Sequence, residues 1–155
     1  MKRMNPLWQL VEEVETIADS DLSSSEKLKA ICSLLRNCVS HYSWVGFYLV
    51  DKAKQNELLL GSFSGEPTTH TRIPFGKGIC GQAAHHKKTI VAQDISQESN
   101  YLSCSPNVKS EIVIPIFRND IIVGKLDIDS HIVSAFTSED EVFLQRICDI
   151  VSRIL

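Results

Sequence analysis

The sequence has no long apolar run and no signal-peptide pattern. Its longest apolar runs, such as residues 112–117 and 58–60, are far shorter than the roughly 20 residues needed to span a bilayer. The first residues, MKRMNPLWQLVEEVE, reach two glutamates before any apolar stretch has the length of a secretory signal. We therefore expect a soluble protein of the cytoplasm, with no membrane partner.

The sequence also lacks an excess of basic charge and a paired-cysteine motif. Its 16 Lys and Arg residues against 19 Asp and Glu residues give a formal net charge of −3, so no broad positive field is available for nucleic acid. The five cysteines have no CxxC spacing. This pattern fits reduced thiols better than a disulfide framework or a zinc site.

No repeat, low-complexity tract or linker divides the chain. Its 155 residues, 43% hydrophobic and 23% charged, have the length and composition of one globular domain. We expect a single domain over residues 1–155, with helices in residues 1–42 and a sheet in residues 43–155.

Three segments have helical periodicity. Apolar residues recur at helical spacing in residues 6–18, and again after Ser23, which is placed to form a capping box with Glu26. Ser138 and Glu141 repeat that capping pattern before a closing helix. Its expected buried face consists of Val142, Leu144, Ile147, Cys148, Val151 and Leu155.

The middle of the chain has strand patterns. Residues 43–50 and 57–63 predict one hairpin, and residues 111–117 and 121–129 predict a second hairpin around residues 118–120. Pro115 favours an edge position or a bulge. A brief strand is expected at 89–92 and a short helix in GICGQAAHH, between two irregular stretches typical of ligand loops. This order predicts an α+β fold, an antiparallel sheet with helices packed on it.

Two cysteines lie where a thiol could be reactive. Cys80 follows Lys77 at the start of the short helix, where backbone N–H groups favour a thiolate, and Cys104 lies in an irregular loop before Lys109. The pair could form a redox couple, or both thiols could be incidental packing residues.

Three carboxylates are expected at one end of the sheet. Asp127 and Asp129 alternate on one strand and therefore share a face, and Glu111 begins the neighbouring strand. Such a cluster needs a cation, either an ammonium group or a metal, unless it is simply a solvated polar face. On the first strand, Trp44 and Tyr48 could form the wall of a small-ligand site or belong to the core.

Several motifs together resemble one family. The segments WVGFYLV at 44–50, LGSFSGEP at 60–67, RIPFGKGICGQA at 72–83, SEIVIPI at 110–116 and GKLDIDS at 124–130 are similar to those of free methionine-R-sulfoxide reductases, which are GAF-domain enzymes. The resemblance implies a GAF-like six-stranded antiparallel sheet with flanking helices, a homodimer, and a cavity that encloses free methionine sulfoxide.

The resemblance also implies roles for individual residues. Cys104 matches the nucleophile and Cys80 its resolving partner, in a sulfenic acid and disulfide cycle that needs a thioredoxin-like reductant but no metal or other cofactor. Trp44 and Tyr48 match the aromatic wall. The residues matched to binding of the substrate's α-ammonium are Glu111, Asp127 and Asp129.

The sequence departs from the family pattern at two places and leaves a second function open. His70 stands where most members carry a third cysteine, and the loop LSCSPNVKSEI around Cys104 differs from the usual family sequence. The alternative to the enzyme is a non-catalytic GAF domain that senses or binds a small molecule in the same cavity. Such modules usually adjoin an output domain, for which 155 residues leave no room, so we expect the enzyme.

Overall fold

A six-stranded antiparallel sheet forms the centre of the molecule, in a computed structural model that describes residues 6–54, 56–98 and 106–155. The strand order is β3-β2-β1-β6-β5-β4. This is the predicted α+β class, with the six antiparallel strands that the resemblance implied. The strands are β1 (Trp44–Val50), β2 (Glu57–Ser64), β3 (Arg72–Pro74), β4 (Ile90–Ala92), β5 (Ser110–Arg118) and β6 (Ile121–Ser130).

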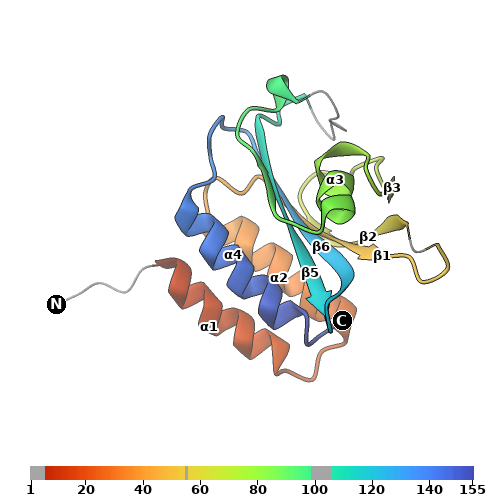
Figure 1. Cartoon of the computed structure of the whole chain (residues 1–155). Helices are drawn as coiled ribbons and strands as arrows, with labels where there is room; N and C mark the ends of the chain where they lie inside the picture. The colour runs from red at the N-terminus through yellow and green to blue at the C-terminus, as the bar shows by residue number, and fades with distance from the viewer. Residues whose placement is uncertain (1–5, 55, 99–105) are drawn as a thin grey trace.

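Helices cover the two faces of the sheet unequally. Helices α1 (Pro6–Ala18), α2 (Ser24–Cys38) and α4 (Ser138–Val151) lie together on one face, whereas α3 (Gly78–His86) lies on the other (Figure 1). A short 3₁₀ turn, η1 (Ile95–Gln97), follows β4. Among the described residues, none of the helices has the length and hydropathy that a membrane span requires.

The two faces of the central strands carry different residues because side chains alternate along a strand. Val45, Phe47, Ile112, Leu126 and Ile128 belong to a fully buried apolar core under α1, α2 and α4. The intervening residues point to the face covered by α3. We call this second side the cavity face; its residues in the three central strands are Trp44, Gly46, Tyr48, Glu111, Val113, Lys125, Asp127 and Asp129.

The β5–β6 hairpin forms as predicted. Asn119 and Asp120 have φ values of 52° and 62°, the left-handed conformation that a two-residue hairpin turn requires. Pro115 lies in β5 beyond the residues that pair with β4, which are 111–113. Pro115 therefore pairs with β6 alone and lies where β5 has no partner on its β4 side, as an edge position allows.

The structure corrects three details of the sequence prediction. The cap of α4 is Thr137, not Ser138, and its capping box is completed by Asp140 rather than Glu141. Val142 is exposed, at 59%, whereas Phe143 is buried. The short strand β3 was not predicted; it pairs with β2 over residues 57–59 and is otherwise part of a Gly- and Pro-rich stretch.

Candidate active site

The three predicted carboxylates meet on the cavity face. Glu111 of β5 lies directly opposite Asp129 of β6, and Asp127 is two residues away on the same strand. Carboxylate oxygens of all three lie within 4.8 Å of one another. Their exposed fractions are only 6%, 3% and 1% for Glu111, Asp127 and Asp129. The alternative of a solvated polar face is therefore wrong.

Burial changes the protonation of this cluster. It raises the pKa of Asp127 from 3.8 to about 6, against the lowering effect of a hydrogen bond with Glu111. Burial also raises the pKa of Asp129 well above 3.8, and the neighbouring charge of Asp127 raises it further. The fold therefore favours the protonated form of these carboxyls more than water does, unless a cation enters.

Two oxygens of the cluster have unused hydrogen-bonding capacity. Oδ1 of Asp127 and Oδ1 of Asp129 are buried and have no hydrogen-bond partner among the described residues. Buried carboxylate oxygens are costly to leave unpaired. A ligand with N–H donors and positive charge satisfies both the hydrogen bonding and the charge.

Two aromatic residues of β1 lie on the same face. Trp44 pairs with Asp129 in the sheet register, and the Trp44 and Tyr48 rings lie 6.5 Å apart between centroids. Trp44 Nε1 donates a hydrogen bond to the Glu66 carbonyl at 2.9 Å, and the Tyr48 hydroxyl donates to the His70 carbonyl at 2.8 Å. Both aromatic residues thereby hold the loop between β2 and β3.

A small cavity adjoins the cluster at Asp129. Its volume is about 80 Å³. Trp44 and Asp129 line it from the sheet, and Glu66 and Val108 line it from the flanking loops. Arg36 of α2, Ser43 and His131 complete the lining among the described residues. Of the predicted site residues, the cavity brings together Trp44 and Asp129.

Lys125 is a cavity-face residue that the sequence analysis missed. It lies two residues from Asp127 on β6, opposite Tyr48 of β1, and its exposed fraction is 0%. A fully buried lysine in a strand is rare. The alternation that placed Asp127 and Asp129 on one face also places Lys125 there, so the signal was present in GKLDIDS.

The two predicted reactive cysteines fall largely outside the described structure. Cys104 lies outside the described residues. Cys80 is the third residue of α3, a helix that packs on β5 and β6. The side chain of Cys80 lies outside the described part of the structure. The predicted cysteine pair is therefore untested by the geometry.

The other three cysteines differ in their surroundings. Cys32 and Cys148 are buried in the helical core, and burial raises the pKa of the Cys32 thiol to about 12 and that of Cys148 above its usual value of 9.0. Such thiols are not ionised near neutral pH and are poor nucleophiles. Cys38 is exposed at the end of α2.

Comparison with known proteins places the chain in a family. The model of the GAF domain matches residues 21–155. The free methionine-R-sulfoxide reductase of Saccharomyces cerevisiae is 32% identical over 152 residues, which cover 95% of this chain and 84% of the yeast protein.

Solved structures give the same result. The free methionine-R-sulfoxide reductase of Neisseria meningitidis in complex with its substrate is 32% identical, with a TM-score of 0.89, and the match covers 96% of this chain and 87% of that one. The reduced form of fRMsr of Staphylococcus aureus is 36% identical, with a TM-score of 0.88, over 100% of this chain and 99% of that one. The chain therefore belongs to the GAF-domain family, in the group that includes the free methionine-R-sulfoxide reductases.

Proposed function

We propose that this protein reduces free L-methionine-R-sulfoxide to methionine. The observation that carries the proposal is the buried Glu111, Asp127 and Asp129 cluster, with its two unpaired carboxylate oxygens, beside an aromatic wall. A free amino acid offers an ammonium group for the carboxylates and an apolar thioether end for the aromatic rings. Membership in a group that contains such reductases supports the same substrate.

The carboxylates have two tasks in this reaction. The ionised members hold the α-ammonium through charge-assisted hydrogen bonds. A member that keeps its proton can donate it to the sulfoxide oxygen, because burial raises the pKa of Asp127 to about 6, and burial with the neighbouring charge of Asp127 raises the pKa of Asp129 above its usual value. One buried cluster thus supplies both anchoring and acid catalysis.

Two cysteines carry the electrons in the proposed cycle. The Cys104 thiolate attacks the sulfoxide sulfur, which is reduced by two electrons to the thioether while Cys104 is oxidised to a sulfenic acid. The Cys80 thiol then attacks the sulfenic sulfur, forming a disulfide and releasing water. An external dithiol of the thioredoxin type reduces this disulfide by exchange. His70 replaces the third cysteine of the family, and a two-cysteine cycle is complete without it.

The proposal includes the domain organisation, the oligomeric state and the cellular location of the protein. We infer that the protein works as a single domain over residues 1–155, as a homodimer, and in the cytoplasm, where a dithiol reductant is available. The mass of the particle in solution, measured by light scattering, tests the dimer directly; a monomer at micromolar concentration would contradict it.

The deciding experiment supplies purified protein with free L-methionine-R-sulfoxide and dithiothreitol and measures the methionine formed. Turnover of the R epimer, little turnover of the S epimer and none in the Cys104→Ser variant is the expected result. Cys38→Ser is the matched control, because Cys38 is exposed and lies at the end of α2, on the opposite side of the sheet from the cavity face. Binding of methionine sulfoxide without turnover in the reduced wild type would instead support the alternative, a non-catalytic small-molecule sensor.

A further inference from the structure

The Trp44 indole lies against two glycines. A Cβ atom built on Gly46 would lie 2.6 Å from Cζ3 of the indole and closer still to Cη2. A Cβ atom built on Gly65 would lie 2.5 Å from Cδ1, at the opposite end of the ring system. Real Cβ atoms do not approach other atoms this closely, so the indole occupies the space that side chains at 46 and 65 would fill. We call this space between Gly46 and Gly65 the indole slot.

The two glycines are required for different reasons. Gly65 has a φ of 136°, which disfavours other residues whatever surrounds it. Gly46 has no positive φ; it lies within β1, where glycine weakens a strand and often marks a close approach. The closest approach at Gly46 is that of the Trp44 ring, two residues away on the same face; Phe63 Cβ, across the pairing with β2, is next at 3.0 Å.

Further contacts restrain the orientation of the indole. The Phe63 ring stacks on it at 5.6 Å between centroids, with an angle of 17° between the planes. The Lys29 ammonium lies 5.5 Å from the centre of the Phe63 ring and donates a hydrogen bond to the Phe63 carbonyl. The hydrogen bond from Nε1 to the Glu66 carbonyl restrains the indole within its plane, and the Phe63 ring covers one of its faces.

The orientation of the ring affects the site because Trp44 is paired with Asp129 and lines the cavity with it. The indole lies over Gly46, and a cavity of about 80 Å³ remains beside Trp44 and Asp129. A methyl group at position 46 would overlap the six-membered ring and displace it from this position. Because Phe63 stacks on one face of the ring, that displacement changes the wall that Trp44 presents to the cavity.

We propose that Gly46 is a positioning residue, which sets the distance between the Trp44 ring and the carboxylate cluster and so determines substrate affinity. This inference rests on the proposed function for its substrate, but the ring geometry itself does not depend on it. Gly46→Ala should raise the KM for free methionine sulfoxide at least tenfold and change kcat less, because the change moves a binding wall and not a reacting group.

Rescue distinguishes positioning through Trp44 from a general effect on the strand. A phenylalanine at position 44 does not reach as far as Cη2 and Cζ3, so in the Trp44→Phe background the methyl group added by Gly46→Ala keeps only the contact with Phe63 Cβ, at 3.0 Å, which is common to both backgrounds. There, Gly46→Ala should change KM less than twofold. A tenfold loss in both backgrounds would overturn the proposal. Gly61→Ala is the control in the neighbouring strand, since its nearest contacts are with Phe47 and Leu49 and not with Trp44.

Two readouts test the indole slot even if the protein does not reduce sulfoxides. The chain has two tryptophans, so in a Trp8→Phe protein the fluorescence reports Trp44 alone. Gly46→Ala should shift this emission to longer wavelength and increase its quenching by acrylamide. The Tm should fall by several degrees on Gly46→Ala with Trp44 present, and by less than half as much in the Trp44→Phe background, where only the contact with Phe63 Cβ remains.

The outcomes separate this inference from the proposed function. Unchanged emission together with equal Tm losses in both backgrounds would refute the indole slot. Failure of sulfoxide reduction in the wild type would refute only the proposed function.

Discussion

At the scale of single residues, the carboxylate cluster links ligand binding to pH. On the proposed function, an ammonium group binds the ionised cluster, and its binding should therefore release a proton that burial retains in the free protein. Because the pKa of Asp127 is raised to about 6, affinity should increase as pH rises through that value and then level off.

The first prediction follows from this linkage. The affinity for free methionine, measured by calorimetry, should rise about tenfold between pH 5 and pH 7, since one proton of pKa about 6 must leave. Repeating the titration in buffers of different ionisation enthalpy should show the released proton. An affinity that stays constant or falls over this range would contradict binding of an ammonium by these carboxylates.

The second prediction separates the ammonium contact from the rest of the ligand. Asp129→Asn removes a charge-assisted hydrogen bond, which should lower affinity for free methionine sulfoxide about ten- to a hundredfold, equivalent to roughly 1.5 to 3 kcal/mol. N-acetylation of the substrate should weaken wild-type binding at least as much, and it should weaken binding to the variant less. Equal processing of both substrates by the wild type would show that the cluster does not recognise an ammonium.

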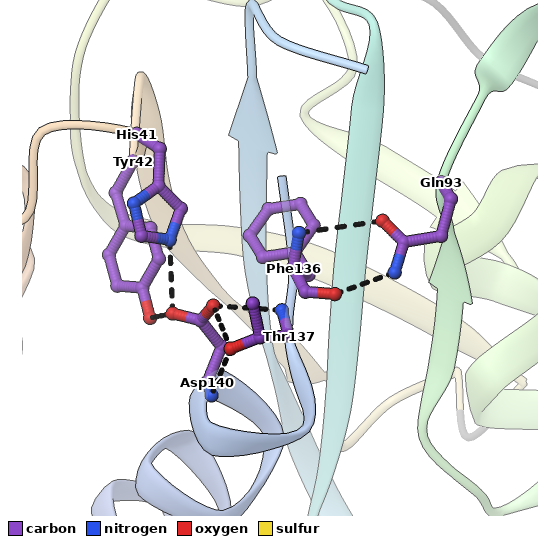
Figure 2. Close-up of polar contacts among 6 residues, drawn as sticks. All are labelled: His41, Tyr42, Gln93, Phe136, Thr137 and Asp140. Carbon is purple, nitrogen blue, oxygen red and sulfur yellow. Dashed lines mark hydrogen bonds and ion pairs between the residues drawn. The ribbon is translucent and has the colours of Figure 1, made fainter. Parts of the chain in front are cut away.

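At the scale of secondary-structure elements, Asp140 joins α4 to the segment before β1. Its Oδ1 accepts a hydrogen bond from the Tyr42 hydroxyl at 2.5 Å and lies 3.0 Å from His41 Nε2, while its Oδ2 accepts from Thr137 (Figure 2). The Gln93 side chain bonds the Phe136 backbone just before the helix (Figure 2). Although burial acts to raise it, these hydrogen bonds to Asp140 hold its pKa below 3.8.

The third prediction concerns this helix cap. Asp140→Asn should destabilise the protein by about 1 to 3 kcal/mol at pH 7, because it weakens the cap and the charged hydrogen bond from Tyr42. A carboxylate with a lowered pKa stabilises the fold above its unfolded pKa and stops doing so as pH falls through the folded value. The difference between wild type and variant in the free energy of unfolding, measured by urea denaturation, should therefore become smaller below pH 4. Glu141→Gln is the control, and an equal loss of stability in it would disprove the specific role of Asp140.

The same helix shows what the sequence could and could not predict. Thr137 with Asp140 and Ser138 with Glu141 both satisfy the pattern of a capping box. The tertiary contacts of Asp140 with His41 and Tyr42 select the first pair, and no local signal reveals contacts between residues so far apart in the sequence. β3 was missed for a related reason, because its three residues are a strand only through pairing with β2.

The acidic cluster was predictable because it depends on alternation along β6 and on one hairpin register. Its burial was not, since that depends on α3 and the loops that cover the cavity face. The indole slot was also not predictable. Gly46 and Gly65 are far apart in the sequence, and only the pairing of β1 with β2 brings the second of them to the indole.

At the scale of the whole molecule, the sheet separates an apolar core from the candidate site. The fourth prediction compares neighbouring residues of β6. Ile128→Ala should cost about 2 to 5 kcal/mol in the free energy of unfolding, because Ile128 is fully buried under the helices. At a temperature where the Ile128→Ala variant is folded, its KM for free methionine sulfoxide should equal that of the wild type.

Asp127→Asn should show the opposite behaviour. The pKa of Asp127 is raised in the fold, so its ionised form is disfavoured there, and removing the charge should increase stability at pH 7 by on the order of 3 kcal/mol. The gain should disappear below pH 4, and the KM should rise. If Asp127→Asn destabilises the protein at pH 7 as much as Ile128→Ala does, the idea that one side of the sheet stabilises the fold and the other binds the substrate is contradicted.

This alternation gives the strands two sets of positions that can change separately. Over residues 44–48 of β1, 111–113 of β5 and 125–129 of β6, side chains alternate between the core under the helices and the cavity face. A lineage can therefore change specificity at cavity-face positions of these stretches without altering the core under the helices, although Gly46 and Asp127 on that face also affect stability. The same rule tells a protein engineer which half of these strands to randomise and which half to leave untouched.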